Sequence, residues 1–317
     1  MRPLPASRTR LPAQPQPTTP PTPTDRAGGG RVTTTARTKA GLKPPFAYYG
    51  GKTTIAARIA ALLPPHGHYV EPFGGSLAVL LAKRPSPMET VNDLDGDLMT
   101  FWRMLRDRPA DLARACALTP HSRAEYLAAR DLDGAPDDLE RARRVWVWLS
   151  QARGDARRRT GWRHYIDPAG STSSMPDYLA GYVARLAPAA ARLARVSLEC
   201  RPALEVIASY GPCGEACLYI DPPYLAATRR PGKYAYEMGS EADHRDLAEA
   251  LHACRAAVVL SGYDHPLYSR LYAGWCRHEI TTATGQGGAW APRTEVLWSN
   301  RPLPTQDAGL FEQEIAS

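Results

Sequence analysis

The sequence lacks the features that mark membrane-spanning and secreted proteins. None of its apolar runs is long enough to cross a bilayer. Residues 1–24 contain no apolar segment of the kind found in signal peptides, so we expect no secretion by that route. The six cysteines are scattered without Cys-x-x-Cys spacing, which argues against a disulfide framework and a structural zinc site. We therefore expect reduced thiols in a cytosolic protein, and no metal site.

The sequence also lacks a complete P-loop. Gly51-Lys52-Thr53 resembles the end of that motif, but its first glycine would fall at position 46, which is Phe46, and no apolar strand precedes it. Lys52 is instead interpreted as a partner for a ligand carboxylate, and Tyr48 as a face for an adenine ring or a sulfonium cation. A surface turn with a solvated lysine is the alternative.

Positive charge is concentrated in two stretches. The chain has 39 Lys and Arg against 32 Asp and Glu, a net charge of +7. Residues 1–43 contain eight basic residues against Asp25, and residues 141–164 contain eight arginines against Asp155. Such concentration is typical of a protein with a surface that faces a polyanion, although a solvated helix face with a charged loop would give the same pattern.

Composition separates the two ends of the chain from its middle. Residues 1–43 are rich in Pro, Thr and Arg and contain no aromatic residue, so we predict a disordered basic tail. Residues 304–317 are interpreted as a flexible C-terminus. The folded region is expected to begin near Pro44.

Strands and helices alternate in the folded region. Tyr69-Val70 is predicted to be a strand that leads through a glycine turn into a helix at 77–82, and a strand at 90–91 leads into a helix at 97–105. Further strands are expected at 256–261, 279–282 and 294–299, the last two as an antiparallel pair around a loop at 285–288. This alternation is typical of an α/β fold with a doubly wound, mostly parallel sheet.

The first turn indicates an adenosine site. Gly74 and Gly75 allow the backbone to approach a ligand closely, and Asp93 follows about twenty residues later, where it could accept hydrogen bonds from ribose hydroxyls. The turn departs from the G-x-G-x-x-G pattern that holds a pyrophosphate. An adenosyl ligand without phosphates therefore fits better.

The segment Tyr219-Ile220-Asp221-Pro222-Pro223-Tyr224 carries the strongest chemical signal. An ionised Asp221 can accept a hydrogen bond from an exocyclic amino group of a base, and the stiff proline corner offers the Pro222 carbonyl as a second acceptor. Tyr224 offers a face on which a base could stack. The combination suits methyl transfer to that amino group, whereas a strand followed by a proline-rich turn is the alternative for this motif alone.

Four motifs in order resemble the Dam-like family of N6-adenine-specific DNA methyltransferases. They are Tyr48-x-Gly-Gly-Lys52, Glu71-Pro-Phe-Gly-Gly-Ser76, Asp93-Leu-Asp-Gly-Asp97 and Asp221-Pro-Pro-Tyr224, and their order and spacing extend the resemblance over Pro45–Asn300. Two positions depart from the family. Tyr48 stands where some members have tryptophan, and Gly75 where many have Ala or another small residue.

The resemblance implies a fold and a cofactor. The fold would be a seven-stranded methyltransferase sheet with an inserted, mainly helical target-recognition domain at 106–194, and the catalytic domain would comprise 44–105 and 195–303. The cofactor would be S-adenosyl-L-methionine, in contact with Tyr48, Gly50, Gly51, Lys52, Glu71, Phe73, Gly74, Gly75, Ser76, Asp93 and Asp221. The catalytic residues would be Asp221, Pro222, Pro223 and Tyr224.

The insertion is predicted to contact double-stranded DNA. Helices are expected at 109–118, 122–130, 137–151 and 176–194, with Ser122 as an N-cap, and a loop rich in glycine and arginine interrupts them at 153–175. A flexible basic loop suits contact with phosphates. The candidate DNA contacts are Arg153, Arg157, Arg158, Arg159, Trp162 and Arg163. Tyr234-Ala235-Tyr236 could close over the substrate.

The expected activity is transfer of a methyl group from S-adenosylmethionine to N6 of a flipped adenine in double-stranded DNA. The setting would be the cytoplasm of a bacterial or phage-infected cell, with no membrane and no obligate protein partner. Three alternatives stay open: a cytosine N4 methyltransferase, where Ser-Pro-Pro-Tyr is commoner, an RNA adenine methyltransferase, and a DNA-binding regulator that has lost catalysis. Asn-Pro-Pro-Tyr marks glutamine methylases, so Asp221 favours adenine.

Overall fold

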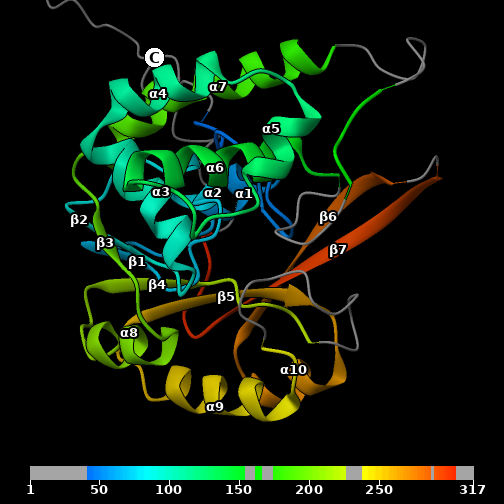
Figure 1. Cartoon of the computed structure of the whole chain (residues 1–317). Coiled ribbons are helices and arrows are strands. Elements are labelled where there is room, and N and C mark those ends of the chain that lie inside the picture. The colour runs from blue at the N-terminus through cyan, green and yellow to red at the C-terminus, as the bar shows by residue number, and fades with distance from the viewer. Residues whose placement is uncertain (1–40, 154–160, 166–173, 226–237, 287–288, 305–317) are drawn as a thin grey trace, which may run out of the picture. The chain divides into compact units, whose positions relative to one another are not determined.

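Seven strands form one sheet in the computed structural model of the chain, which describes residues 41–153, 161–165, 174–225, 238–286 and 289–304. They are β1 (His68–Glu71), β2 (Met88–Asn92), β3 (Ser197–Glu199), β4 (Ala216–Ile220), β5 (Ala257–Tyr263), β6 (Cys276–Gln286) and β7 (Ala289–Ser299). Their order is β3-β2-β1-β4-β5-β7-β6 (Figure 1). Neighbours from β3 to β5 are parallel, and β7 is antiparallel to both β5 and β6. The predicted doubly wound, mostly parallel, seven-stranded sheet is confirmed.

Both faces of the central strands are buried, which explains their unbroken apolar sequences. Successive side chains of a strand point to opposite faces. On β4, Cys217 and Tyr219 join one hydrophobic core, while Leu218 and Ile220 join the other. The strand therefore carries no polar face.

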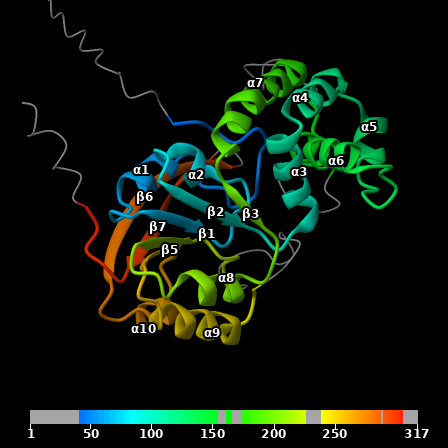
Figure 2. The same ribbon diagram turned by 90° about the vertical axis from the view of Figure 1, so that its left-hand side faces the viewer.

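Helices cover each face of the sheet (Figures 1 and 2). On one side lie α8 (Ala203–Tyr210), α9 (Glu241–His252) and α10 (Pro266–Leu271), whose buried side chains share a core with Leu218. On the other lie α1 (Ala56–Ala61), α2 (Ala78–Ala82) and α3 (Gly96–Asp107), which share the core that contains Tyr219.

A further group of helices packs against α3 (Figure 2). It comprises α4 (Pro109–Leu118), α5 (Arg123–Ala128), α6 (Asp138–Gln151) and α7 (Met175–Leu193). Trp146 of α6 and Leu186 of α7 lie in the same hydrophobic core as Trp102 of α3. The Trp146 indole also donates a hydrogen bond to the Pro45 carbonyl at 2.9 Å. These helices thus share the core of the sheet region, and the domain boundaries at 106 and 194 stay predictions.

Local capping chemistry sets the helix boundaries that the sequence predicts. Ser122 caps α5 by accepting from the Glu125 amide, and Asp137 caps α6 by accepting from the Glu140 amide. The sequence analysis did not identify α1, β3, α8, α9 or α10. Of the described residues, no helix has the length and apolarity needed to cross a membrane.

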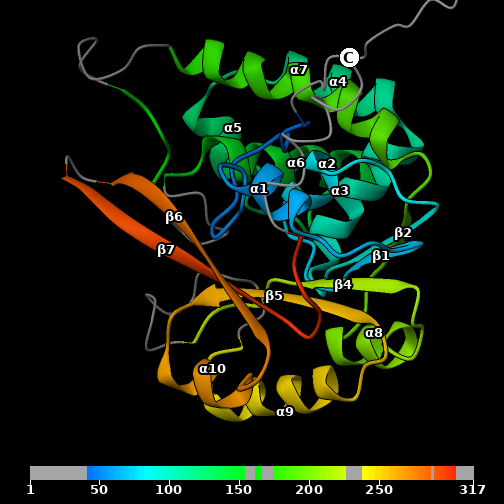
Figure 3. The ribbon, with the colours of Figure 1, turned by 180° about the vertical axis from the view of Figure 1, so that it is seen from behind.

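The β6–β7 hairpin corrects one prediction. Residues 285–288 were expected to form a loop, but β6 continues to Gln286, which pairs with Ala289 at the tip of the ladder (Figure 3). Backbone pairing in an antiparallel hairpin does not require apolar residues. The glycines at 285–288 therefore led to a predicted loop that is longer than the observed one.

Candidate active site at the carboxyl ends of β1, β2 and β4

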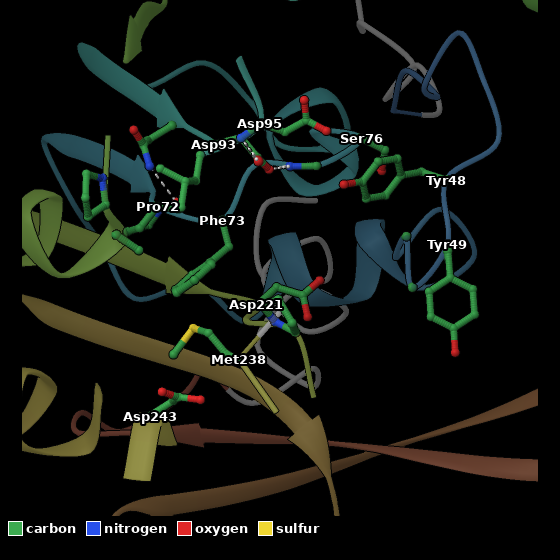
Figure 4. Close-up of a pocket in the computed structure, with 18 of the residues that line it drawn as sticks. Tyr48, Tyr49, Pro72, Phe73, Ser76, Asp93, Asp95, Asp221, Met238 and Asp243 are labelled. Carbon is green, nitrogen blue, oxygen red and sulfur yellow. Dashed lines mark hydrogen bonds between the residues drawn. The ribbon is translucent and has the colours of Figure 1, made fainter. Parts of the chain in front are cut away.

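A cavity of about 370 Å³ lies where the sheet order reverses between β1 and β4. Such a switch point is the usual ligand site of an open α/β sheet. Figure 4 shows Phe73, Asp93 and Asp221 around this space, each from a segment that follows a different parallel strand. The predicted site residues that line the cavity are Tyr48, Gly50, Gly51, Phe73, Gly75, Ser76, Asp93, Asp221 and Pro223.

The glycine turn after β1 fits closely against its neighbours. Gly75 has φ +48°, and a Cβ there would lie 2.8 Å from Cε1 of Tyr48. A Cβ on Gly74 would lie 3.0 Å from the Asn92 carbonyl, which accepts a 2.7 Å hydrogen bond from the Gly74 amide. Gly75 therefore shapes the cavity wall, whereas Gly74 allows the turn to approach β2. Leu77, at φ 52°, completes the tight entry into α2.

Asp93 links the turns after β1 and β2. Its Oδ2 accepts from the Gly75 amide at 2.8 Å, and its Oδ1 accepts from the Asp95 amide at 2.9 Å. Asp95 in turn caps α3 by accepting from the amides of Asp97 and Leu98. The Asp93 carboxylate is thus fixed by backbone groups at the wall of the cavity, where a hydroxyl of a ligand could reach it.

Asp221 follows β4 and accepts several hydrogen bonds. Lys52 Nζ lies 2.7 and 2.8 Å from its two oxygens and also donates to the Gly50 carbonyl at 3.1 Å. Ser261 donates to Asp221 Oδ1 at 3.0 Å, and the Tyr224 hydroxyl lies 3.2 Å from the same oxygen. Lys52, predicted to meet a ligand carboxylate, meets this protein carboxylate.

Tyr224 is buried at 5% exposure. Its ring meets the ring of Tyr263 edge-on at 4.6 Å, and Lys52 Nζ lies 4.9 Å from its centroid. Burial, followed by the charges of Asp221 and Glu295, raises the pKa of its hydroxyl. Tyr263 and Lys52 thus lie close to the ring, and stacking of a base on Tyr224 stays a prediction.

Glu295 is a site residue that the sequence analysis missed. It lies on β7, and its Oε1 accepts from the Tyr224 hydroxyl at 2.5 Å and lies 3.6 Å from Lys52 Nζ. A signal was available, because period-two alternation puts Glu295 on the same face as Leu297, which is a core residue. A charged residue at a core position of a strand indicates a paired buried group.

Glu71 was predicted to contact the cofactor, but it does not line the cavity. It is buried, and it accepts a 3.0 Å hydrogen bond from the Tyr69 hydroxyl. Burial raises the pKa of its carboxyl to about 8. The structure supports a role for Glu71 inside the protein, at the end of β1, and contact with a ligand stays a prediction.

Part of the remaining cavity wall comes from elements that the sequence did not indicate. Pro202, Ala203 and Leu204 lie where β3 leads into α8, and Asp243 and Asp246 lie on α9. The remaining lining residues are Tyr49, Pro72, Asn92, Leu94, Asp95 and Met238. Among the described residues of the lining there are five aspartates and no lysine or arginine. Lys52 offsets the charge of Asp221, and the lining still has an excess of carboxylates, which favours a cationic ligand.

The basic loop is closed at its base by two backbone hydrogen bonds. The Arg153 amide donates to the Gly161 carbonyl at 2.8 Å, and the Arg163 amide donates to the Gln151 carbonyl at 2.8 Å. The Trp162 ring stacks on His121 at 4.3 Å. Arg157, Arg158, Arg159 and Tyr234-Ala235-Tyr236 lie outside the described residues.

Trp162 and Arg163 have protein partners at the base of this loop. The Trp162 indole donates to Gln151 at 3.2 Å, and Arg163 donates to the Tyr178 hydroxyl at 2.7 Å. These contacts favour a supporting role for both side chains. Contact of this segment with DNA stays a prediction.

Tertiary structure partly neutralises the second basic stretch. Arg141 pairs with Asp97 at 2.5 Å, and Arg143 and Arg144 pair with Glu140 at 2.6 and 2.8 Å. Asp97 is distant in sequence, and Glu140 lies just before the counted stretch. The charge excess of the folded surface is therefore smaller than the sequence count indicates.

Comparisons with known proteins identify the family. The model of the D12 class N6 adenine-specific DNA methyltransferases matches residues 48–284. A search of curated proteins gave no match. Similar solved structures include a precorrin-6y C5,15-methyltransferase from Geobacter metallireducens (10% identity, TM-score 0.32, 78% of this chain and 85% of that chain). They also include the rRNA methyltransferase aviRa from Streptomyces viridochromogenes (14% identity, TM-score 0.34, 80% of this chain and 85% of that chain). On the family match, the chain belongs to the D12 class N6 adenine-specific DNA methyltransferase family.

Proposed function

We propose that the chain binds S-adenosylmethionine in the cavity and methylates N6 of an adenine flipped out of double-stranded DNA. One observation carries the proposal. Asp221 of the Asp-Pro-Pro-Tyr corner lies in the same cavity as Gly51, Gly75 and Asp93, at the carboxyl ends of three parallel strands. Four motifs that are far apart in sequence thus contribute to a single site.

The cavity fits the proposed cofactor in size and chemistry. Its volume of about 370 Å³ is in the range of small-molecule sites. The aspartates of its wall favour a ligand with sulfonium and ammonium charges, and Asp93 would accept hydrogen bonds from the ribose hydroxyls. Apolar contacts from Leu94, Pro202 and Leu204 suit the flat faces of a purine. When bound, S-adenosylmethionine supplies an electrophilic methyl group.

The chain's own residues would align and activate the amino group of the base. Asp221 accepts one N6 hydrogen, and the Pro222 carbonyl accepts the other, so that the nitrogen lone pair turns toward the methyl group. Alignment of this kind is the main requirement of a direct methyl transfer. Lys52 holds the Asp221 carboxylate in place through its two short contacts.

Substitution of Asp221 tests the assignment. Asp221→Ala should lower the rate of tritiated methyl incorporation into unmethylated duplex DNA by at least about 10²-fold, because the amino group loses its anionic acceptor. Asp264→Ala is the matched control, since Asp264 is exposed and outside the cavity. Full activity of the Asp221 variant would contradict the proposal.

The methylated product separates the alternatives. Nuclease digestion and mass spectrometry of the product should give N6-methyladenine; N4-methylcytosine would indicate the cytosine enzyme. Parallel reactions with RNA of the same sequence test the RNA alternative. Cofactor binding by calorimetry without methyl transfer on any acceptor would indicate a silent DNA-binding protein.

A further inference from the structure

Glu295 is a buried carboxylate for which the proposed reaction has no role so far. It is 7% exposed and does not line the cavity. The β5–β7 ladder pairs it with Tyr263, next to the ring of Tyr224. It also lies beyond residue 284, where the family match ends.

Glu295 and Asp221 share one hydrogen-bond donor, the Tyr224 hydroxyl, and one cation, Lys52. The Tyr224 hydroxyl lies 2.5 Å from Glu295 Oε1 and 3.2 Å from Asp221 Oδ1. Lys52 Nζ lies 3.6 Å from Glu295 and 2.7 Å from Asp221. Tyr224 and Lys52 therefore lie between the two carboxylates. A substitution or protonation of Glu295 would change how strongly these two side chains interact with Asp221.

The tyrosine hydroxyl can serve one carboxylate at a time. It carries one hydrogen, and the shorter distance gives that hydrogen to Glu295. An ionised carboxylate offers about four acceptor positions, of which Lys52 and Ser261 use up to three on Asp221. Asp221 Oδ1, which the Tyr224 hydroxyl approaches, already accepts from Lys52 and Ser261, so the acceptor position left for the amino group of a base is on Oδ2. If the hydroxyl turned to Asp221, it would be a third donor on Oδ1 and would displace Lys52 or Ser261, whose hydrogen would then compete for the position on Oδ2.

We infer that Glu295 is a positioning residue for methyl transfer, which holds the Tyr224 hydroxyl and so keeps an acceptor position of Asp221 open to the amino group. The inference rests on the proposed function of Asp221. Glu295 acts through Tyr224 and touches neither the cofactor nor the base.

The state of protonation of Glu295 decides which way the hydroxyl turns. The titratable groups that face Glu295 are Lys52, Tyr219, Asp221, Tyr224 and the Tyr263 that opposes it on β5. Burial raises the pKa of the Glu295 carboxyl, Lys52 lowers it and Asp221 raises it further. Protonated Glu295 donates to the Tyr224 oxygen, and the tyrosine hydrogen then turns to Asp221. Activity should therefore fall as pH falls through the raised pKa of Glu295.

The test compares Glu295→Gln and Glu295→Asp with the wild type over a pH series, on duplex DNA at a range of cofactor concentrations. We expect kcat of Glu295→Gln to fall about ten- to a hundredfold at neutral pH, with the KM for S-adenosylmethionine changed less than threefold. The fall of kcat on the acidic side of its pH profile should move to lower pH in Glu295→Gln, because glutamine does not titrate. Glu295→Asp keeps the charge and should recover part of the activity. Glu279→Gln on β6 is the matched control, since that side chain is exposed.

A double-mutant cycle tests whether Glu295 acts through the tyrosine hydroxyl. Tyr224→Phe keeps the ring and removes the only hydrogen that Glu295 directs away from Asp221. In this background Glu295→Gln should lower kcat less than threefold, so that the two effects are not additive. Equal effects of Glu295→Gln in both backgrounds would overturn the inference.

The outcomes separate this inference from the proposed function. A wild-type protein that methylates no nucleic acid would contradict the proposed function. Methylation by the wild type together with unchanged kcat and an unchanged acidic side of the pH profile in Glu295→Gln would contradict the inference alone. Urea unfolding of each variant shows whether a loss of kcat reflects loss of the fold.

Discussion

At the scale of single residues, Gly75 and Tyr48 fit closely against each other at the cavity wall. Gly75 stands where many members of the family have a small side chain, and in this chain the face of Tyr48 occupies the space that a Cβ would need. Tyr48 itself stands where some members have tryptophan. The two positions that depart from the family are thus in contact with each other. A tryptophan at position 48 would place different ring atoms against residue 75.

Glu71 gives a pH-dependent prediction at this scale. Its pKa is raised from 4.5 to about 8, chiefly by burial, so the folded state holds a proton that the unfolded state releases. The stabilising contribution is complete below pH 4.5 and is lost as pH rises through about 8. Glu71→Gln keeps an acceptor for Tyr69 and does not titrate. At pH 8 it should raise the free energy of unfolding by about 4 kcal/mol.

Urea unfolding at a series of pH values from 5 to 9 measures this effect. The difference between variant and wild type should grow with pH. A constant difference across the series would show that the Glu71 carboxyl titrates in its ordinary range.

Among the elements, α7 shows how the helical segment is joined to the sheet. Arg192, near the end of α7, pairs with Glu89 of β2, and Lys83 after α2 pairs with the same carboxylate at 2.5 Å. The three side chains are nearly buried. A buried carboxylate between two cations requires both partners, because desolvation of an incompletely paired charge is costly.

This ion cluster gives a stability prediction. Arg192→Ala should lower the free energy of unfolding by about 3 kcal/mol, because Glu89 keeps one of its two cations in a buried setting. Arg195→Ala, an exposed arginine just beyond the helix, is the matched control and should change it by less than about 0.5 kcal/mol. A similar small change in both variants, measured by urea unfolding, would mean that the cluster does not anchor α7.

Over the whole molecule, the sequence sets the net charge, and the fold sets which charged side chains are paired. The chain carries +7, yet Arg141, Arg143 and Arg144 are paired with carboxylates in the structure. The arginines at 157–159 lie outside the described residues, between two ends that a backbone ladder holds together. Together with the exposed Arg153, they are the part of the second basic stretch on which the DNA prediction now depends.

Salt dependence of binding tests that prediction. Replacement of Arg157, Arg158 and Arg159 by Ala should weaken duplex DNA binding and reduce the slope of log K against log salt by about three, if each contacts a phosphate. The control replaces Arg108, Arg245 and Arg277, which pair with surface carboxylates, and so removes equal charge. Fluorescence anisotropy from 50 to 300 mM salt measures both slopes. Equal slopes would argue against phosphate contact at this loop.

The sequence by itself determined the type of fold and the main chemistry of the site. Periodic apolar residues and caps such as Ser122 are local signals, and turn residues such as Gly75 and Asp221 follow strands whose carboxyl ends must meet in a parallel sheet. These features need only neighbouring residues to be recognised. For that reason the cavity could be located before any contact was known.

Only the tertiary structure decided which charged groups meet. Lys52 pairs with Asp221, and Glu295 lies 3.6 Å from Lys52. Glu71 is absent from the cavity lining. All three findings depend on how distant segments pack. The apolar wall at Leu204 depends on β3 and α8, whose short sequences carry no distinctive period. Hydrogen bonds across the chain are fixed by packing and desolvation, and these are properties of the folded core that no local pattern encodes.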